Sequence, residues 1–298
     1  MCPLLNNPES RPDHEEAFSL VELLVAVSIT TVIIFALYAI FDHTQKAFRG
    51  SISQVDVMES GRAAMDLITR DLEQLSASNE ANVTNLFARV PASAVPLSQL
   101  LPGDTIRTNQ LQDFFFLSRI NNNWSLSGYS IVPALTNSPV GTLNRFSAST
   151  NSIQRKILFD YIAMYFQGSL PTVGWAPVID GVVHLTFLPY DGDGSLRSRT
   201  RSGPSDSQEV KPYERSPVLM SRTITAPGFV FDNRTAYRYF CVSNALPPFI
   251  EVQLGILEPQ ILEQYKSMPS NVASNFLARQ AGRVHLFRQR IAIHTASR

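Results

Sequence analysis

The amino-acid sequence predicts an α+β protein, in which a long N-terminal helix precedes a domain built on an antiparallel β-sheet. Three observations lead to this fold class. An apolar run extends from Phe18 to Phe41, apolar residues then recur with helical spacing from Asp42 to about Leu75, and several later segments alternate apolar with polar residues. We therefore expect four regions: residues 1–17, a helix over 18–41, its extension over 42–75, and a globular domain over 76–298.

Length and charge restrict the classes of function that fit the chain. Its 298 residues are enough to bury a sizeable core. The 25 Lys and Arg residues balance 25 Asp and Glu residues, so the net charge gives no attraction toward nucleic acid. We expect no nucleic-acid partner.

The apolar run is predicted to cross a membrane. It has 24 residues and one ionisable side chain, Glu22. At about 1.5 Å per residue it forms a helix about 36 Å long, enough to span a hydrocarbon core of about 30 Å. The run is longer than the core of a secretory signal, and no A-x-A cleavage site follows it. These features favour a transmembrane helix over a buried core helix or a cleaved signal.

Glu22 needs an explanation of its own. A carboxylate five residues into an apolar span costs about 2 to 4 kcal/mol. It either has a function there, or it reaches the membrane interface and is favoured by the positive end of the helix dipole. Its position alone leaves both interpretations open.

The residues around Glu22 resemble a known processing signal. The eight residues AFSLVELL, from Ala17 to Leu24, are similar to the type IV prepilin signature. The resemblance implies that a prepilin peptidase cleaves between Ala17 and Phe18 on the cytoplasmic side, and that the new Phe18 amine is methylated. It also implies that the Glu22 carboxylate neutralises the N-terminal amine of a neighbouring subunit, so that two charges in an apolar bundle become a pair. The implied partners are other pilin or pseudopilin subunits, the peptidase and an inner-membrane assembly platform.

The leader departs from the family in two respects. Alanine stands at position 17, where the family usually has glycine, and residues 1–17 carry four acidic residues against Arg11. Lys46 and Arg49 follow the span on the side that we expect to be external, and the positive-inside rule disfavours basic residues there. The acidic residues of the leader contribute little to that rule. We keep the orientation that the resemblance implies, with a cytoplasmic N-terminus and a periplasmic C-terminal domain.

The helix is predicted to continue beyond the membrane as an amphipathic segment. Its apolar positions are Phe48, Ile52, Val55, Met58, Met65, Ile68, Leu72 and Leu75, and its polar face carries Glu59, Arg62, Asp66, Arg70, Asp71 and Glu73. Gly50 and Gly61 are predicted to mark bends. An independent helical hairpin or coiled coil is less favoured, because the heptad pattern is not sustained.

The rest of the chain reads as a half-buried antiparallel sheet with surface connections. Strands are predicted at Phe114 to Leu117, Ile157 to Gln167, Val182 to Tyr190, Phe249 to Leu257 and Val284 to His294. Connections are predicted at Ser76 to Asp104, Thr136 to Ser152 and Arg197 to Arg215. Short helices interrupted by Pro269 are predicted between Glu258 and Ala281.

The order of these strands, the Asp-Gly-Asp-Gly turn at 191–194 and the segment from Leu246 to Val252 resemble a J-type minor pseudopilin of type II secretion. They also resemble pilin-like cassette proteins of Verrucomicrobia. The resemblance implies a minor subunit at the tip of a filament.

The Asp-Gly-Asp-Gly turn is the one sequence that suggests a metal. Asp191 and Asp193 could offer oxygen ligands to calcium. Position 195 is serine, however, and the twelfth loop position is Ser202, where an EF-hand has glutamate. The pattern favours a simple turn after a strand, and we expect no cofactor.

Other reactive residue types point to structural roles. Arg197, Arg199 and Arg201 form an alternating basic patch, which we interpret as part of a solvated loop. None of the five histidines has zinc-ligand spacing, and His184 and His285 are predicted to face solvent on strands. Cys2 and Cys241 would lie on opposite sides of the membrane and could not pair, so Cys241 is expected to be a buried free thiol.

No catalytic motif is present, so we expect a protein that is not an enzyme. The preferred function is a minor pilin or pseudopilin that assembles through its N-terminal helix into a type IV pilus or a type II secretion pseudopilus. The alternative is a signal-anchored periplasmic enzyme or ligand-binding domain that joins no filament. A tip adhesin that binds glycans or DNA through surface loops is compatible with the first.

Overall fold

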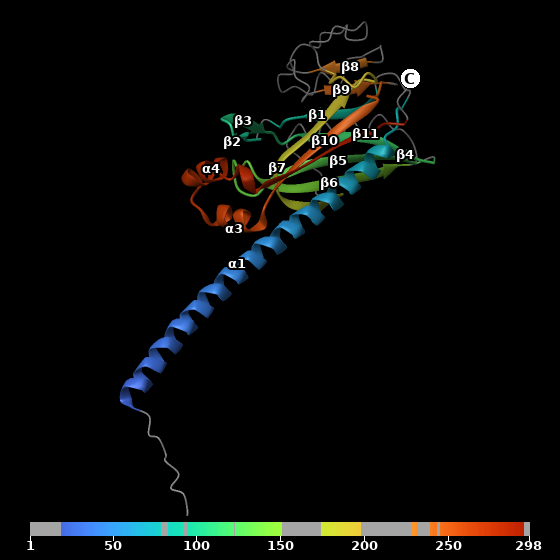
Figure 1. The fold of residues 1–298 in the computed structure, drawn as a ribbon. Coiled ribbons are helices and arrows are strands. Elements are labelled where there is room, and N and C mark those ends of the chain that lie inside the picture. Colours follow the sequence, from blue (N-terminus) through green and yellow to red (C-terminus); the bar gives the residue numbers. More distant parts are fainter. Residues whose placement is uncertain are drawn as a thin grey trace, which may run out of the picture. The chain divides into compact units, whose positions relative to one another are not determined.

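A computed structural model describes residues 19–78, 83–91, 94–121, 123–150, 174–197, 228–231, 239–242 and 245–294. The chain divides into two compact units, Met1–Ile52 and Ser53–Arg298. Helix α1, Leu20–Glu73, contributes its first part to one unit and its last part to the other. The α+β class is confirmed, because a long apolar N-terminal helix is followed by an antiparallel sheet (Figure 1).

In its described residues, the second unit is built on a curled nine-stranded sheet. Every neighbouring pair of strands is antiparallel, in the order β11-β10-β7-β6-β5-β4-β1-β9-β8. The strands are β1 Thr84–Arg89, β4 Asp113–Ile120, β5 Asn123–Pro133, β6 Gly141–Thr150, β7 Trp175–Tyr190, β8 Gly228–Phe231, β9 Tyr239–Val242, β10 Phe249–Leu257 and β11 Val284–Ala292.

Smaller elements complete this unit. Strands β2 Leu97–Leu101 and β3 Thr105–Asn109 form a separate hairpin. Two short helices, α3 Pro259–Ser267 and α4 Ser270–Ala278, lie on either side of Pro269, as predicted, and the 3-10 turn η2 Ala281–Arg283 follows. A proline cannot donate the backbone hydrogen bond that would join the two helices into one.

Strand β7 is long and pairs with two different strands, which lie on either side of it in the sheet. Its first part pairs with β6, and its part from Val182 onward pairs with β10. Gly181 lies at the change of partner with φ 76°, where a Cβ would come 3.2 Å from the carbonyl oxygen of Leu257. Glycine is therefore required at this position to bring the two halves of the sheet into one surface.

The last part of α1 packs on one face of the sheet. Val57, Ala64, Ile68 and Leu72 are buried at helical spacing in the main core cluster. The sheet contributes Leu86, Phe114, Phe116, Tyr129, Leu143, Leu185, Phe187, Tyr239, Cys241, Val252 and Leu254 to the same cluster. The expectation of a buried Cys241 is confirmed.

Gly61 is a contact point between helix α1 and the sheet. Helix α1 continues through both Gly50 and Gly61. A Cβ on Gly61 would lie 2.2 Å from the Phe287 ring on β11, whereas nothing lies within 4 Å of the same position on Gly50. The missing side chain lets the helix approach the edge strand of the sheet.

Four of the predicted strands are confirmed, and two predicted connections are wrong. Ile157 to Gln167 lies outside the described residues. The predicted connection Ser76 to Asp104 contains β1 and β2, and the predicted loop Thr136 to Ser152 contains β6. Strand β6 lacks a clear alternation because it places Arg145, a charged residue, on the face that meets the helix. A polarity pattern cannot reveal such a strand.

The contact at Gly61 yields a stability test. We expect Gly61→Val to lower the free energy of unfolding by about 1 to 3 kcal/mol, because overpacking forces the Phe287 ring out of place. Thermal unfolding by circular dichroism measures the loss, and Gly50→Val is the matched control with space around it. If the two substitutions had equal effects, the close contact would be contradicted.

Candidate functional site

The N-terminus of α1 is built by Ser19 and Glu22. The Ser19 backbone N–H donates to Glu22 Oε2 at 3.1 Å, and the Ser19 hydroxyl donates to the same oxygen at 3.2 Å. In return, the Glu22 backbone N–H donates to Ser19 Oγ at 3.3 Å. This reciprocal pair is a capping box, which satisfies backbone donors that a helix start leaves free. The S-x-x-E spacing could have revealed it in the sequence.

The capping box lies beyond the predicted cleavage site. Ala17 and Phe18 are outside the described residues, so the structure places neither partner of the scissile bond. Ser19 follows that bond, and its amide remains a peptide N–H after cleavage. The hydrogen bonds of Glu22 therefore do not depend on the leader.

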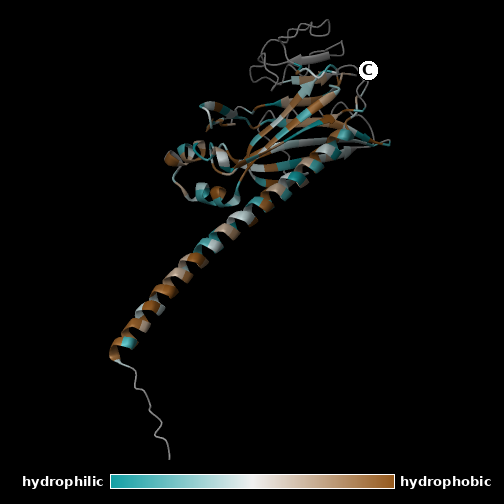
Figure 2. Cartoon of the chain, viewed as in Figure 1, coloured by the Kyte–Doolittle hydropathy of each residue, from teal (hydrophilic) through white to brown (hydrophobic). Residues whose placement is uncertain are grey.

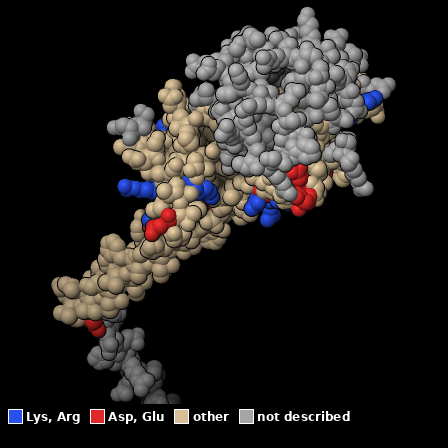
Figure 3. All heavy atoms as spheres, turned by 90° about the horizontal axis from the view of Figure 1, so that it is seen from above, with Lys and Arg blue, Asp and Glu red and all other residues tan. Residues whose placement is uncertain are grey.

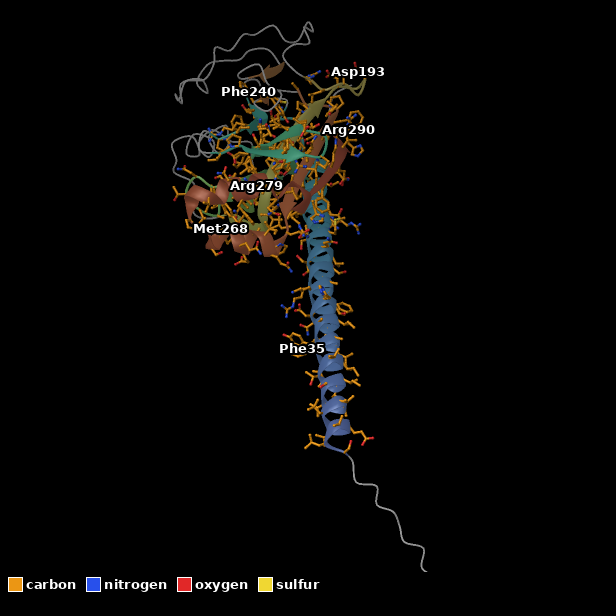
Figure 4. The ribbon with its side chains drawn as sticks, turned by 60° about the vertical axis from the view of Figure 1, so that its left-hand side comes forward. Phe35, Asp193, Phe240, Met268, Arg279 and Arg290 are labelled. Carbon is orange, nitrogen blue, oxygen red and sulfur yellow. The ribbon has the colours of Figure 1, made fainter. Side chains whose placement is uncertain are left out.

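The first part of α1 presents apolar side chains on all sides. Leu20 is 80% exposed, Phe35 70% and Tyr38 71%. Most of this part of the helix has the hydrophobic colour in Figure 2, and Phe35 projects from the helix in Figure 4. The space-filling view shows this part as a largely uncharged surface (Figure 3). Among the described helices, α1 is the one long and apolar enough to cross a membrane, which fits a membrane anchor.

The exposed apolar surface extends past the predicted span. Phe48 and Ile52 follow Phe41 at steps of seven and four residues, which keeps all three on one side of the helix. Phe48 is 65% exposed and Ile52 59%. At about 1.5 Å per residue, Phe48 lies about 10 Å beyond Phe41 along the helix, outside the hydrocarbon core if the span ends at Phe41. Lipid chains then do not cover it.

Asp71 anchors the other end of α1 to the sheet. It was predicted on the polar face of the helix, and this is wrong, because Asp71 is buried. Arg145 on β6 donates to its carboxylate from Nε at 2.6 Å and from Nη2 at 3.0 Å, and the Tyr129 hydroxyl on β5 donates at 2.6 Å. A buried carboxylate needs such partners to offset its desolvation. We call this group the Asp71 anchor.

The electrostatics of the Asp71 anchor keep its donors protonated. Burial and the adjacent Asp71 raise the pKa of Tyr129 far above its ordinary value. The hydrogen bond to Asp71 raises the pKa of Arg145. Tyr129 therefore donates its proton to the carboxylate at any physiological pH.

The Asp-Gly-Asp-Gly segment forms a tight turn. The backbone N–H of Gly194 donates to the Asp191 carbonyl at 2.9 Å, and Gly194 has φ 79°. The Asp191 carboxylate accepts a hydrogen bond from Arg197, and Asp193 accepts hydrogen bonds from the backbone and hydroxyl of Ser195. Both candidate calcium ligands are thus engaged within the turn.

A second arginine, Arg290, lies beside this turn. Arg290 lies over the Tyr190 ring at 3.8 Å and reaches toward Gly194, at the same end of the domain as Asp193 (Figure 4). No group of three or more His, Cys, Asp or Glu able to hold a metal occurs in the described part of the chain. Of the predicted basic patch, Arg197 pairs with Asp191, and Arg199 and Arg201 lie outside the described residues.

Asp113 is a buried carboxylate at the start of β4. It accepts a hydrogen bond from Ser130 at 2.7 Å, and Arg89 Nε lies 3.9 Å from its second oxygen. Burial raises its pKa from 3.8 to about 7, although Ser130 and Arg89 both act to lower it. The carboxylate is therefore partly protonated at neutral pH.

His184 on β7 is also buried, so its predicted solvent-facing position is wrong. Its Nδ1 accepts the Gln110 backbone N–H at 3.1 Å, and Gln253 Oε1 lies 3.4 Å from Nε2. Burial lowers its pKa from 6.5 to about 4, with a smaller contribution from Arg107. His285 is half-buried beside Glu258, with Nε2 3.3 Å from Oε1.

Comparison with known proteins gives no relative from which a role could be carried over. No family model matches the chain, and neither a curated protein nor a solved structure matches it. The residues themselves are then the basis for assigning a function.

The two buried titrating groups predict opposite pH effects. From pH 4 to 7 the folded protein keeps Asp113 protonated while the unfolded chain releases that proton, so this group lowers stability as pH rises. From pH 6.5 down to 4 the unfolded chain protonates His184 and the folded protein does not, so this group lowers stability as pH falls.

We therefore expect Asp113→Asn to make the protein more acid-sensitive than wild type, and His184→Gln to make it less so. Each difference is up to about 4 kcal/mol across its window, since one pKa unit corresponds to about 1.4 kcal/mol. Melting temperatures from pH 4.5 to 8 measure both, with the exposed Asp66→Asn as control. Parallel pH profiles for all four proteins would contradict the assignment.

Proposed function

We propose that this chain is a membrane-anchored minor subunit of a type IV pilin-like filament, matured by a prepilin peptidase. One observation carries the proposal: the AFSLVELL segment stands at the start of a helix whose apolar surface is exposed through the predicted span and beyond it. A membrane accounts for the first part of that surface. Packing against helices of other subunits accounts for the part around Phe48 and Ile52.

Glu22 has two tasks in this proposal. In the single chain it caps its own helix through Ser19. In a filament its carboxylate also faces the methylated Phe18 amine of a neighbour, where an opposite charge offsets the cost of burying both. The capping bonds hold the carboxylate at the helix start, where that amine would lie.

The rest of the chain supports a subunit present in few copies. A domain that begins near residue 76 and whose described part contains a nine-stranded sheet is large for a repeated filament subunit. In this proposal the domain is periplasmic and displayed at the tip, and the partners are other pilin or pseudopilin subunits and an inner-membrane assembly platform.

Maturation gives the first test. We expect intact-mass and N-terminal peptide mass spectrometry of the membrane-extracted protein to find a chain that starts at methylated Phe18, because the peptidase cleaves after Ala17. Cells lacking the peptidase serve as the control and should retain residues 1–17. A chain that still starts at Met1 in cells with active peptidase would instead support a signal-anchored domain that joins no filament.

Two substitutions separate the tasks of Glu22. We expect Glu22→Ala to reduce incorporation into sheared filaments at least about tenfold, because an uncompensated amine costs more than about 1.4 kcal/mol in an apolar bundle. Ser19→Ala removes the two hydroxyl hydrogen bonds of the cap but keeps the carboxylate, and it should leave incorporation within about twofold of wild type. Quantitative immunoblotting measures both, and equal losses would assign Glu22 to capping alone.

A further inference from the structure

The last part of α1 carries a row of exposed charges on the side away from the sheet. The row consists of Glu59, Arg62, Asp66, Arg70 and Glu73, all exposed and separated by steps of three or four residues. A helix turns about 100° per residue, so these residues share one side, roughly opposite the buried Val57, Gly61, Ala64 and Ile68. The sign of the charge alternates at every step. We call these five residues the charged row.

The charges of this row point outward. Neighbouring members are three or four residues apart, a spacing at which an Asp or Glu can reach an Arg. Along the described helix, Asp42 and Lys46 do form such an ion pair at 2.7 Å, but no neighbouring pair of the charged row is within 4 Å. The row presents five separate charges to whatever lies beside it.

We propose that the charged row recognises the same row of a second copy of this chain, parallel to it and shifted by one step. A shift of three or four residues, about 5 Å along the helix, sets Glu59 beside Arg62 of the other copy and continues the match through Glu73. Four pairs of opposite charge result. With no shift, five pairs of like charge face one another.

This inference rests on the proposed function in one respect. Two helices anchored in the same membrane from the same side are parallel, and an antiparallel partner is then excluded by topology. Exposed ion pairs are individually weak, so the row sets the register and orientation of the pair more than its strength. The apolar surface that includes Phe48 and Ile52 supplies the attraction.

Charge redesign of the full-length chain tests the proposal. Arg62→Glu with Arg70→Glu makes the row entirely acidic, whereas Glu59→Lys with Asp66→Lys and Glu73→Lys makes it entirely basic. Each variant repels itself at every shift, but the two attract each other. All five side chains are exposed, so both variants should keep the wild-type melting temperature. Asp56→Lys with Ser60→Lys, two exposed changes outside the row, is the control.

The readout is energy transfer between donor- and acceptor-labelled chains in phosphatidylcholine vesicles. We expect wild type and control to transfer at least about twofold above random mixing. Energy transfer within each redesigned variant alone should fall to the level of random mixing. Energy transfer between the acidic and the basic variant in a mixture should return to the wild-type level. Wild-type transfer by either variant alone, or no recovery in the mixture, would overturn the proposal.

A short thiol cross-linker tests the shift itself, in chains whose Cys2 and Cys241 are replaced by serine and alanine. We expect the cross-linking yield between Glu59→Cys and Arg62→Cys chains to be several-fold higher than the yield between two Glu59→Cys chains. Equal yields would overturn the shift. These outcomes are separable from the proposed function. If the charge variants behave as wild type while Glu22→Ala still loses filament incorporation, this inference fails and the proposed function stands.

Discussion

The second unit depends on a carboxylate placed on the buried side of a helix. Asp71 would be costly there without partners, because a desolvated charge must be offset by close donors. Arg145 and Tyr129 supply them from adjacent strands, β6 and β5. The ion pair thus fixes both the rotation of the last turn of α1 and the strands it contacts. The apolar contacts at Ile68 and Leu72 are less selective, since alternative rotations could also bury apolar residues.

The sequence predicted the elements whose pattern of apolar residues follows from one requirement, the removal of apolar side chains from water. The uninterrupted apolar run predicted the first part of α1, and alternation predicted β10 from Phe249 to Leu257. It failed where a polar residue is buried with a partner far away in the chain. Asp71 and Arg145 are 74 residues apart, and each reads as solvent-exposed by itself. His184 was misplaced for the same reason, because Gln110 and Gln253, its partners, come from other segments.

The candidate site was only partly accessible to prediction. Glu22 stood out because a single charge in an apolar run requires an explanation. The resemblance of the surrounding residues to a processing signal supplied one. Its local role as a helix cap follows from the S-x-x-E spacing of Ser19 and Glu22. Both interpretations of Glu22 drawn from the sequence involve a membrane, and they therefore missed this role. The structure shows that Glu22 satisfies a backbone donor of its own helix start, and this local role is compatible with the role that we propose for its charge in a filament. The turn at Asp191 and Asp193 was correctly predicted from its glycines.

The contact between Gly61 and Phe287 joins segments that are far apart in the sequence. During synthesis the helix is made before β11, which completes the surface that the helix packs against. The helix consequently has no complete packing surface until β11 has been synthesised. Contacts of such long sequence separation also slow folding, since the intervening loop must close before they form. The helix is therefore complete well before the sheet that it packs against.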